Sequence, residues 1–180
     1  MRNRTLKELI LTAEFAAIIS VLSQMTIPFG LVPLTGQTFA IGLTATFLGR
    51  KLGLISVAVY LLLGLIGLPV FSGMTGGIAV LFGPTGGYLI GFLLQTWITG
   101  WMIERTDAHY LYAIFANLMG SLAALICGTI WLKISGDLTF TTAFASGLLP
   151  FLLPEAIKAT GAAYIGILMK KRLNRFLHTN

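Results

Sequence analysis

The chain has 180 residues, of which 56% are hydrophobic and only 10% are charged. A soluble domain carries about 25% charged residues, so this composition leaves too little polar surface to cover a water-soluble globule. The composition therefore predicts an all-α integral membrane protein. Residues 1–180 are expected to form a single membrane domain, without a separate soluble domain.

The formal net charge of +6 arises from basic residues that gather at the ends of apolar runs. Ten of the twelve lysines and arginines would lie on one side of a membrane if the runs alternate in direction: Arg2, Arg4, Lys7, Arg50, Lys51, Arg105, Lys170, Lys171, Arg172 and Arg175. Cytoplasmic loops of membrane proteins carry such an excess. The pattern predicts that both termini are cytoplasmic. Lipid headgroups account for the charge, so nucleic-acid binding is not expected.

Six apolar spans are predicted, at about residues 6–25, 35–49, 52–66, 84–103, 110–134 and 154–169. The second and third are short, because a straight helix needs at least about 17 residues to cross the hydrocarbon. Pro84 and Pro154 are expected at the first position of their helices, where a missing N–H is tolerated. Residues 104–109 form a polar connection. The apolar segment 139–153 is expected to dip into the membrane or to cap its outer side.

The stretch 67–88 interrupts the apolar sequence with seven glycines and two prolines, inside a run without any charged residue from 52 to 103. Irregular backbone is not tolerated against lipid, because each unpaired N–H or C=O group there costs several kcal/mol. The stretch must therefore be covered by protein or line a cavity, and a ligand site is the hypothesis that follows. Phe71 and Tyr88 lie within it, where either ring could stack against a flat ligand.

Glu155 and Lys158 are the only ionisable pair in the last long apolar run, from 138 to 169. Residues three apart share a face of a helix. Charged residues inside the apolar slab are costly and usually face a cavity or a partner, which favours a ligand role. The alternative is an interfacial pair in which the Lys158 side chain extends outward to water.

Three uncharged polar residues each allow two interpretations. Thr35 and Gln37 open the second span, where they could contact a ligand, or where Thr35 could cap the helix and Gln37 could lie at the interface. Asn117 lies midway along the fifth span, and a buried Asn must form hydrogen bonds. Those bonds could join helices, which is the more common outcome, or could reach a ligand.

Ala13 and Ala17 form a face of small residues on the first span. This spacing allows another helix to approach closely, either from a partner protein or from the same bundle.

The sequence offers no convincing catalytic set. His109 and His178 lie at polar or terminal positions, so a Ser-His-Asp arrangement is not expected. Cys127 is the single cysteine and lies in an apolar run, as a packing residue would. Because the Gly-x-x-x-x-Gly-Lys-Ser/Thr motif is missing, transport driven by ATP would require another subunit. We therefore expect neither an enzyme nor a metal or cofactor site.

The glycine-rich block carries a family resemblance. Its letters are GLPVFSG-x-x-GG followed by GPTGGY, and the chain also contains Thr35-Gly36-Gln37 and Glu155-x-x-Lys158. Over about residues 6–172 the sequence resembles the BioY family, the biotin-specific substrate-binding (S) components of energy-coupling-factor (ECF) transporters. One motif differs: the last span of the family usually reads Pro-Gly-Asp-x-x-Lys. Here the carboxylate is one methylene longer and the proline lies one position later.

The resemblance implies a compact S-component bundle of six transmembrane helices in a prokaryotic cell membrane, with an irregular outer loop between helices 3 and 4. It implies that the protein captures biotin from outside and associates with a transmembrane coupling subunit and two ATP-binding-cassette ATPase subunits. The face of Ala13 and Ala17 is similar to the docking surface that S components offer to the coupling subunit. An S component for another vitamin, or a membrane-embedded enzyme, remains an alternative.

Ligand roles follow from the same resemblance. Glu155 would accept an N–H of the ureido group, while Lys158 would neutralise Glu155 and donate to the ligand. The remaining polar contacts would come from Thr35, Gln37, Thr85, Asn117 and backbone N–H groups. Phe71 and Tyr88 would supply aromatic surface, and Gly73, Gly76 and Gly77 would let the backbone approach the ligand. The outer loop, residues 67–83, would act as a lid.

Overall fold

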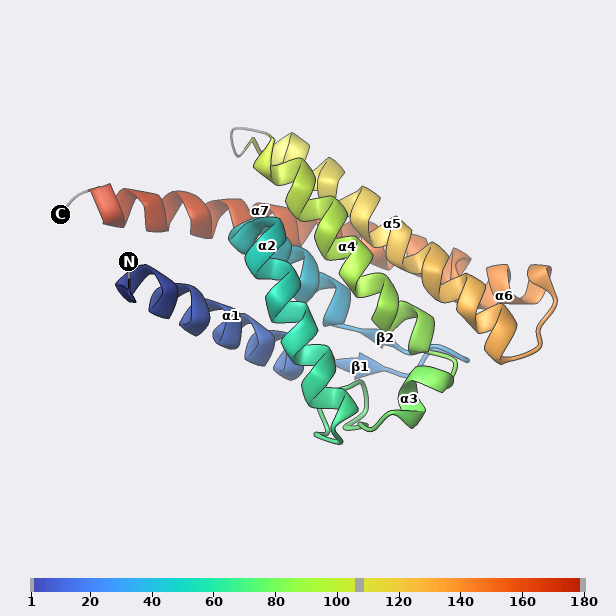
Figure 1. The fold of residues 1–180 in the computed structure, drawn as a ribbon. Coiled ribbons are helices and arrows are strands. Elements are labelled where there is room, and N and C mark those ends of the chain that lie inside the picture. The colour runs from blue at the N-terminus through green and yellow to red at the C-terminus, as the bar shows by residue number, and fades with distance from the viewer. Residues whose placement is uncertain (1, 106–108, 179–180) are drawn as a thin grey trace.

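The computed structural model describes residues 2–105 and 109–178, most of which are helical (Figure 1). In chain order the elements are α1 (Arg2–Ser23), β1 (Thr26–Ile27), β2 (Leu34–Thr35), α2 (Gln37–Leu65), α3 (Ala79–Phe82), α4 (Gly86–Glu104), α5 (Tyr110–Ser135), α6 (Phe140–Gly147), a 3₁₀ turn (Leu149–Phe151) and α7 (Leu152–His178). The two strands form an antiparallel hairpin. Figure 1 shows both ends of the chain on one side of the molecule, with the hairpin, α3 and α6 on the other.

Helix α2 is broken at Gly49, where φ is 77° and ψ is −171°. Side-chain-bearing residues rarely adopt a positive φ, so glycine suits this position. The Glu104 carboxylate lies beside the break, and its Oε1 accepts a hydrogen bond of 2.7 Å from the Arg50 N–H. The chain doubles back at this point (Figure 1). Helix α2 therefore consists of two halves joined by a tight turn at Gly49, which is the last residue of the second predicted span.

Helix α4 packs along both α5 and α2. Glycines permit this close approach: a Cβ at Gly91 would lie 2.9 Å from the Cα of Ala124 in α5. On the other side, a Cβ at Gly100 would lie 2.5 Å from the Cα of Arg50 in α2. Small residues allow membrane helices to pack at short distances in this way. The three helices therefore form the centre of the bundle, against which α1 and α7 pack.

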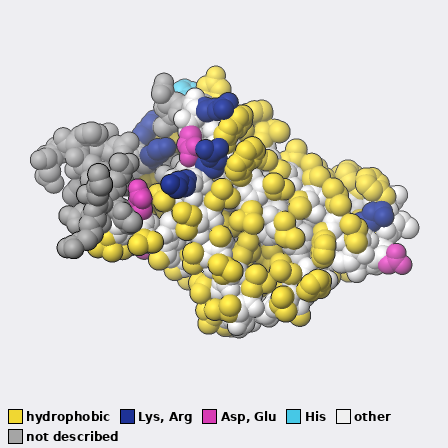
Figure 2. Space-filling model, in the orientation of Figure 1, with side chains coloured by type: hydrophobic (Ala, Val, Ile, Leu, Met, Phe, Trp, Pro, Cys, Tyr) yellow, Lys and Arg dark blue, Asp and Glu magenta, His cyan; other side chains and the backbone are white. Residues whose placement is uncertain are grey.

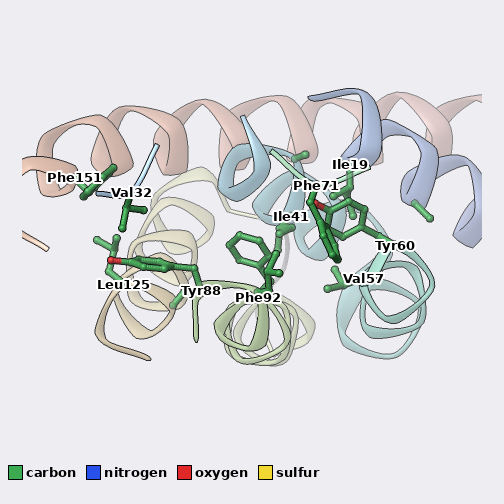
Figure 3. Packing of buried hydrophobic residues seen from close by; sticks show 14 of the residues in the cluster. Ile19, Val32, Ile41, Val57, Tyr60, Phe71, Tyr88, Phe92, Leu125 and Phe151 are labelled. Carbon is green, nitrogen blue, oxygen red and sulfur yellow. The ribbon is translucent and has the colours of Figure 1, made fainter. Parts of the chain in front are cut away.

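The main apolar core joins side chains from α1, α2, α4, α5 and the loops on the side of the hairpin (Figure 3). Ile19, Ile41, Tyr60 and Phe71 are among its members, and each is at most 1% exposed. Because Phe71 belongs to the outer loop, the core extends into a segment without regular helix. This burial holds the outer loop against the bundle.

The outer surface of the bundle is apolar, as a lipid-facing surface requires. Figure 2 shows hydrophobic side chains over most of the visible face, with most of the visible Lys and Arg side chains gathered toward one end. Among the described residues, three helical segments are long and apolar enough to cross a membrane: Gln37–Leu65, Tyr110–Ser135 and Phe140–Arg172. The prediction of a helical, membrane-spanning chain is confirmed at this level. The count of six spans stays a prediction.

The positions of Pro84 and Pro154 in their helices were predicted wrongly. Helix α4 begins at Gly86, so Pro84 precedes the helix, because Thr85 occupies the capping position and its C=O accepts the first bonds. Helix α7 begins at Leu152, so Pro154 is the third helical residue, because the 3₁₀ turn leads directly into the helix. Pro154 is still within the first turn, where its missing N–H has no partner in any helix.

The fifth predicted span, 110–134, is confirmed to within one residue by α5. Segment 139–153 forms α6, the 3₁₀ turn and the first two residues of α7. The polar connection 104–109 lies partly outside the described residues, as do the side chains of Arg2, Arg4 and Arg175, on which the charge pattern also depends.

Candidate ligand-binding site

A cavity of about 320 Å³ lies between the hairpin, the outer loop, α4 and α7. Its wall is mostly apolar, and aromatic rings from the outer loop, α4 and the 3₁₀ turn contribute to it. Small-molecule sites are typically apolar clefts of about 300–1,000 Å³ with a few placed polar groups. Seven of the predicted site residues line this cavity: Thr35, Gln37, Phe71, Thr85, Tyr88, Glu155 and Lys158.

The polar corner of the cavity is built by α7 and the start of α2. Glu155 and Lys158 form an ion pair through Oε1 and Nζ, as their spacing on the helix predicts. The Thr38 hydroxyl lies between them: it donates to Glu155 Oε1 at 2.8 Å and accepts from Lys158 Nζ at 2.7 Å. Lys158 Nζ also donates to the Thr35 C=O at 3.0 Å. The corner thus joins two helices that are more than a hundred residues apart in the chain.

Lys158 and Glu155 differ in whether they have hydrogen-bonding atoms left without a partner. An ammonium has three hydrogens to donate, and Lys158 has three partners for them in this corner. Glu155 uses only Oε1, and its Oε2 is buried without a hydrogen-bond partner among the described residues. A buried acceptor without a partner is costly, so a donor from a ligand would be favourable there. Within this corner, Oε2 of Glu155 is the acceptor left for a further donor, and Lys158 holds the carboxylate in place.

Gln37 lies beside this corner and is fixed by its neighbours. Its Oε1 accepts from the Thr35 hydroxyl at 2.8 Å, and its Nε2 donates to the Tyr60 hydroxyl at 2.6 Å. Thr35 Oγ1 also accepts a weaker bond of 3.3 Å from the Gln37 N–H, while Gly36 occupies the capping position of α2. Thr35 therefore supports the helix start and orients Gln37 at the same time.

Phe71 forms one aromatic wall. Its ring fills a notch at Gly64, where a Cβ would lie 2.1 Å from Phe71 Cζ. It also meets the Tyr60 ring edge to face, with centroids 5.6 Å apart (Figure 3). Such edge-to-face contacts are favourable because the ring edge is positive and the ring face is negative.

Tyr88 forms a second aromatic wall on α4. Its hydroxyl donates to the Gly147 C=O at 2.7 Å, which ties the α6 segment to the cavity wall. The Tyr88 ring therefore lines the cavity, while its hydroxyl is bonded to the α6 segment.

Four predicted residues lie away from the cavity wall. Within the described chain, Asn117, Gly73, Gly76 and Gly77 are not among the residues that line it. Asn117 is fully buried between helices, where its Nδ2 donates to Thr46 Oγ1 at 2.8 Å. Gly73 and Gly77 have φ values of 68° and 95°, and a Cβ at Gly76 would lie 2.4 Å from the Leu68 oxygen. These three glycines shape the outer loop.

Several wall residues were missed by the sequence analysis. The most important is Thr38, which connects the ion pair to α2. Its signal was present, since Thr35, Gln37 and Thr38 form a polar group at the start of an apolar helix. The apolar wall residues carried no such signal: Val32, Leu89, Phe92, Leu125 and Phe151.

The comparisons with known proteins agree with this architecture. The BioY family model matches residues 1–175. The biotin transporter BioY2 of Lactococcus lactis subsp. cremoris is 43% identical over 180 residues, which cover 100% of this chain and 97% of that protein. The biotin transporter BioY of Thermotoga maritima is 40% identical over 168 residues, with 92% and 97% covered.

A solved structure is also similar. The crystal structure of the S-component for biotin from an ECF-type ABC transporter matches with a TM-score of 0.89 and 32% identity, over 95% of this chain and 94% of that one. Both the extent of the family match and the identity to these relatives exceed what a shared fold alone would give. The chain belongs to the BioY family.

Proposed function

We propose that this chain is the biotin-binding membrane subunit of an ECF-type vitamin uptake transporter. The observation that carries the proposal is a mostly apolar cavity with one buried, unpartnered carboxylate oxygen, in a chain of the BioY family. Biotin has an apolar fused ring, a ureido group with two N–H donors, and a carboxylate tail. An apolar wall with a fixed acceptor suits the fused ring and the ureido group.

In this proposal, Oε2 of Glu155 accepts a ureido N–H. Lys158 compensates the charge of Glu155 and orients it through Thr38, since its own donors are already used inside the protein. Phe71 and Tyr88 flank the fused ring, and the outer loop closes over it as a lid. Charge-assisted hydrogen bonds of this kind are about twice as strong as neutral ones, so Glu155 carries much of the affinity.

We further propose six spans: α1, the two halves of α2, α4, α5 and α7, within one domain over residues 1–180. Both termini and the basic turns then face the cytoplasm of a prokaryotic cell, and the hairpin, α3 and α6 face outward. The cavity opens to the outer side in this orientation, where biotin is captured.

Delivery to the cytoplasm is proposed to require the transmembrane coupling subunit and two ATPase subunits. Ala13 and Ala17 lie exposed on α1, while Ala16 between them is buried in the bundle. An exposed face of small residues allows a partner helix to pack closely. Ala13→Trp should therefore abolish co-purification with the coupling subunit and leave biotin binding intact. Ala145→Trp, at an exposed position of α6, is the matched control and should co-purify normally.

The direct test of ligand identity is mass spectrometry of small molecules released from the purified protein. Biotin at near-equal stoichiometry, together with saturable binding in titration calorimetry, is the expected result. Release of a different vitamin at that stoichiometry, with no biotin binding, would overturn the assignment.

A further inference from the structure

The outer loop contains a small turn that lies against the cavity. Phe71 and Thr75 pair across it, and the Phe71 N–H donates to the Thr75 C=O at 3.0 Å. Met74, at the end of the turn, has a φ of 56°, which a residue with a side chain rarely adopts. The inner side of this turn carries Phe71, Ser72 and Thr75, which all line the cavity. The turn is therefore a unit that must move if a ligand is to pass this side of the cavity.

Gln24, at the outer end of α1, holds this turn from the side away from the cavity. Its Nε2 donates to the Phe71 C=O at 3.1 Å, and its Oε1 accepts from the Met74 N–H at 2.9 Å. One side chain thus bonds both arms of the turn, as a neighbouring strand would. The hydroxyl of the preceding residue, Ser23, donates to the Val70 C=O. Among the described residues, Gln24 is not part of the cavity wall.

We infer that Gln24 is a positioning residue that holds the turn 71–75 closed and limits the rate at which biotin enters and leaves; this rests on the proposed function. The bond between Phe71 and Thr75 moves with the turn when it opens. The two bonds to Gln24 connect the turn to α1, so they must break. Loop opening of this kind often sets the rates of ligand exchange.

The test is Gln24→Ala, measured by association and dissociation of radiolabelled biotin on purified protein. Because the two bonds to Gln24 must break each time the turn opens, for entry and for exit alike, we expect both rates to rise about tenfold while Kd changes little, a factor that corresponds to about 1.4 kcal/mol. A merely damaged cavity would instead weaken Kd without faster association. Thr160→Ala, on the exposed face of α7, removes a hydroxyl that bonds only its own helix and should leave both rates unchanged.

A cysteine pair tests the same inference without removing Gln24. The hydroxyl oxygens of Thr26 and Ser72 lie 3.1 Å apart, so Thr26→Cys with Ser72→Cys places two thiols close enough to be joined by an added oxidant. Cys127→Ala serves as the background. Oxidised protein should exchange bound biotin far more slowly than the same protein after reduction.

The outcomes separate the two proposals. If the wild type binds biotin but Gln24→Ala leaves both rates unchanged, or if oxidised and reduced cysteine variants exchange equally fast, the inference is wrong and the proposed function stands. If the wild type does not bind biotin, both are wrong.

Discussion

Replacement of Lys158 by Met tests the central assignment. Met retains an apolar stem but removes the ammonium, and with it the ion pair to Glu155 and the bonds to Thr38 and the Thr35 C=O. Glu155 is 5% exposed and would keep only the Thr38 hydroxyl as a donor. Removing one partner of a buried ion pair costs about 3–5 kcal/mol.

The cost in affinity should be smaller, because the Lys158 side chain is 18% exposed and water reaches part of the site. We expect a loss of at least about 2 kcal/mol, or about 30-fold in Kd. Titration calorimetry with biotin in detergent measures it, with Lys133→Met as the control, since Lys133 is exposed in the last turn of α5. A folded Lys158→Met protein that binds biotin as tightly as the wild type would refute the role of this corner.

Three further substitutions separate the cavity wall from its support. Gly64→Ala places a methyl group where the Phe71 ring lies, so biotin affinity measured by calorimetry should fall at least about tenfold; unchanged affinity would show that the ring is not needed there. Tyr88→Phe removes the bond to Gly147 and should lower the free energy of unfolding by about 1 kcal/mol, with affinity retained in calorimetry. Asn117→Ala should likewise lower the free energy of unfolding, by about 1–2 kcal/mol, without changing biotin affinity. A selective loss of affinity would instead restore the ligand role considered for Asn117.

Local signals were sufficient for α5. A polar connection precedes it, and Gly136 and Asp137 follow its last residue, so both ends could be predicted. Between those ends the segment is apolar, and a helix satisfies every backbone group without water. The structure places the helix at Tyr110–Ser135. Chain composition decides such boundaries, and no tertiary contact is needed.

Thr38 could not be assigned in this way. A threonine in an apolar helix usually bonds the carbonyl four residues back, as Thr44 and Thr46 do in the same helix. Its place beside Thr35 and Gln37 marks Thr38 as a polar residue at the helix start, but the local sequence does not predict which side chains it bonds. Its different role depends on Glu155 and Lys158, which the fold brings beside it from α7.

The outer loop lies between these cases. Its many glycines predicted irregular backbone near a cavity. Phe71 and Tyr88 both line that cavity, and their contact with a ligand stays a prediction. The structural role of each glycine was not predictable, because a loop has no regular periodicity from which to infer which residues face the cavity. Gly73 and Gly77 allow positive φ values, which only the folded backbone reveals.

The break at Gly49 has a consequence for how far a bound molecule must travel. Thr38 lies at the polar corner of the cavity, and the chain turns back at Gly49 in the same half of α2. At a rise of 1.5 Å per residue, the two are separated by about 16 Å, roughly half of the 30 Å hydrocarbon thickness. In the proposed orientation, the layer of protein between the ligand and the cytoplasmic side is therefore thin. Release to the cytoplasm then requires passage through a short barrier rather than across the whole bilayer.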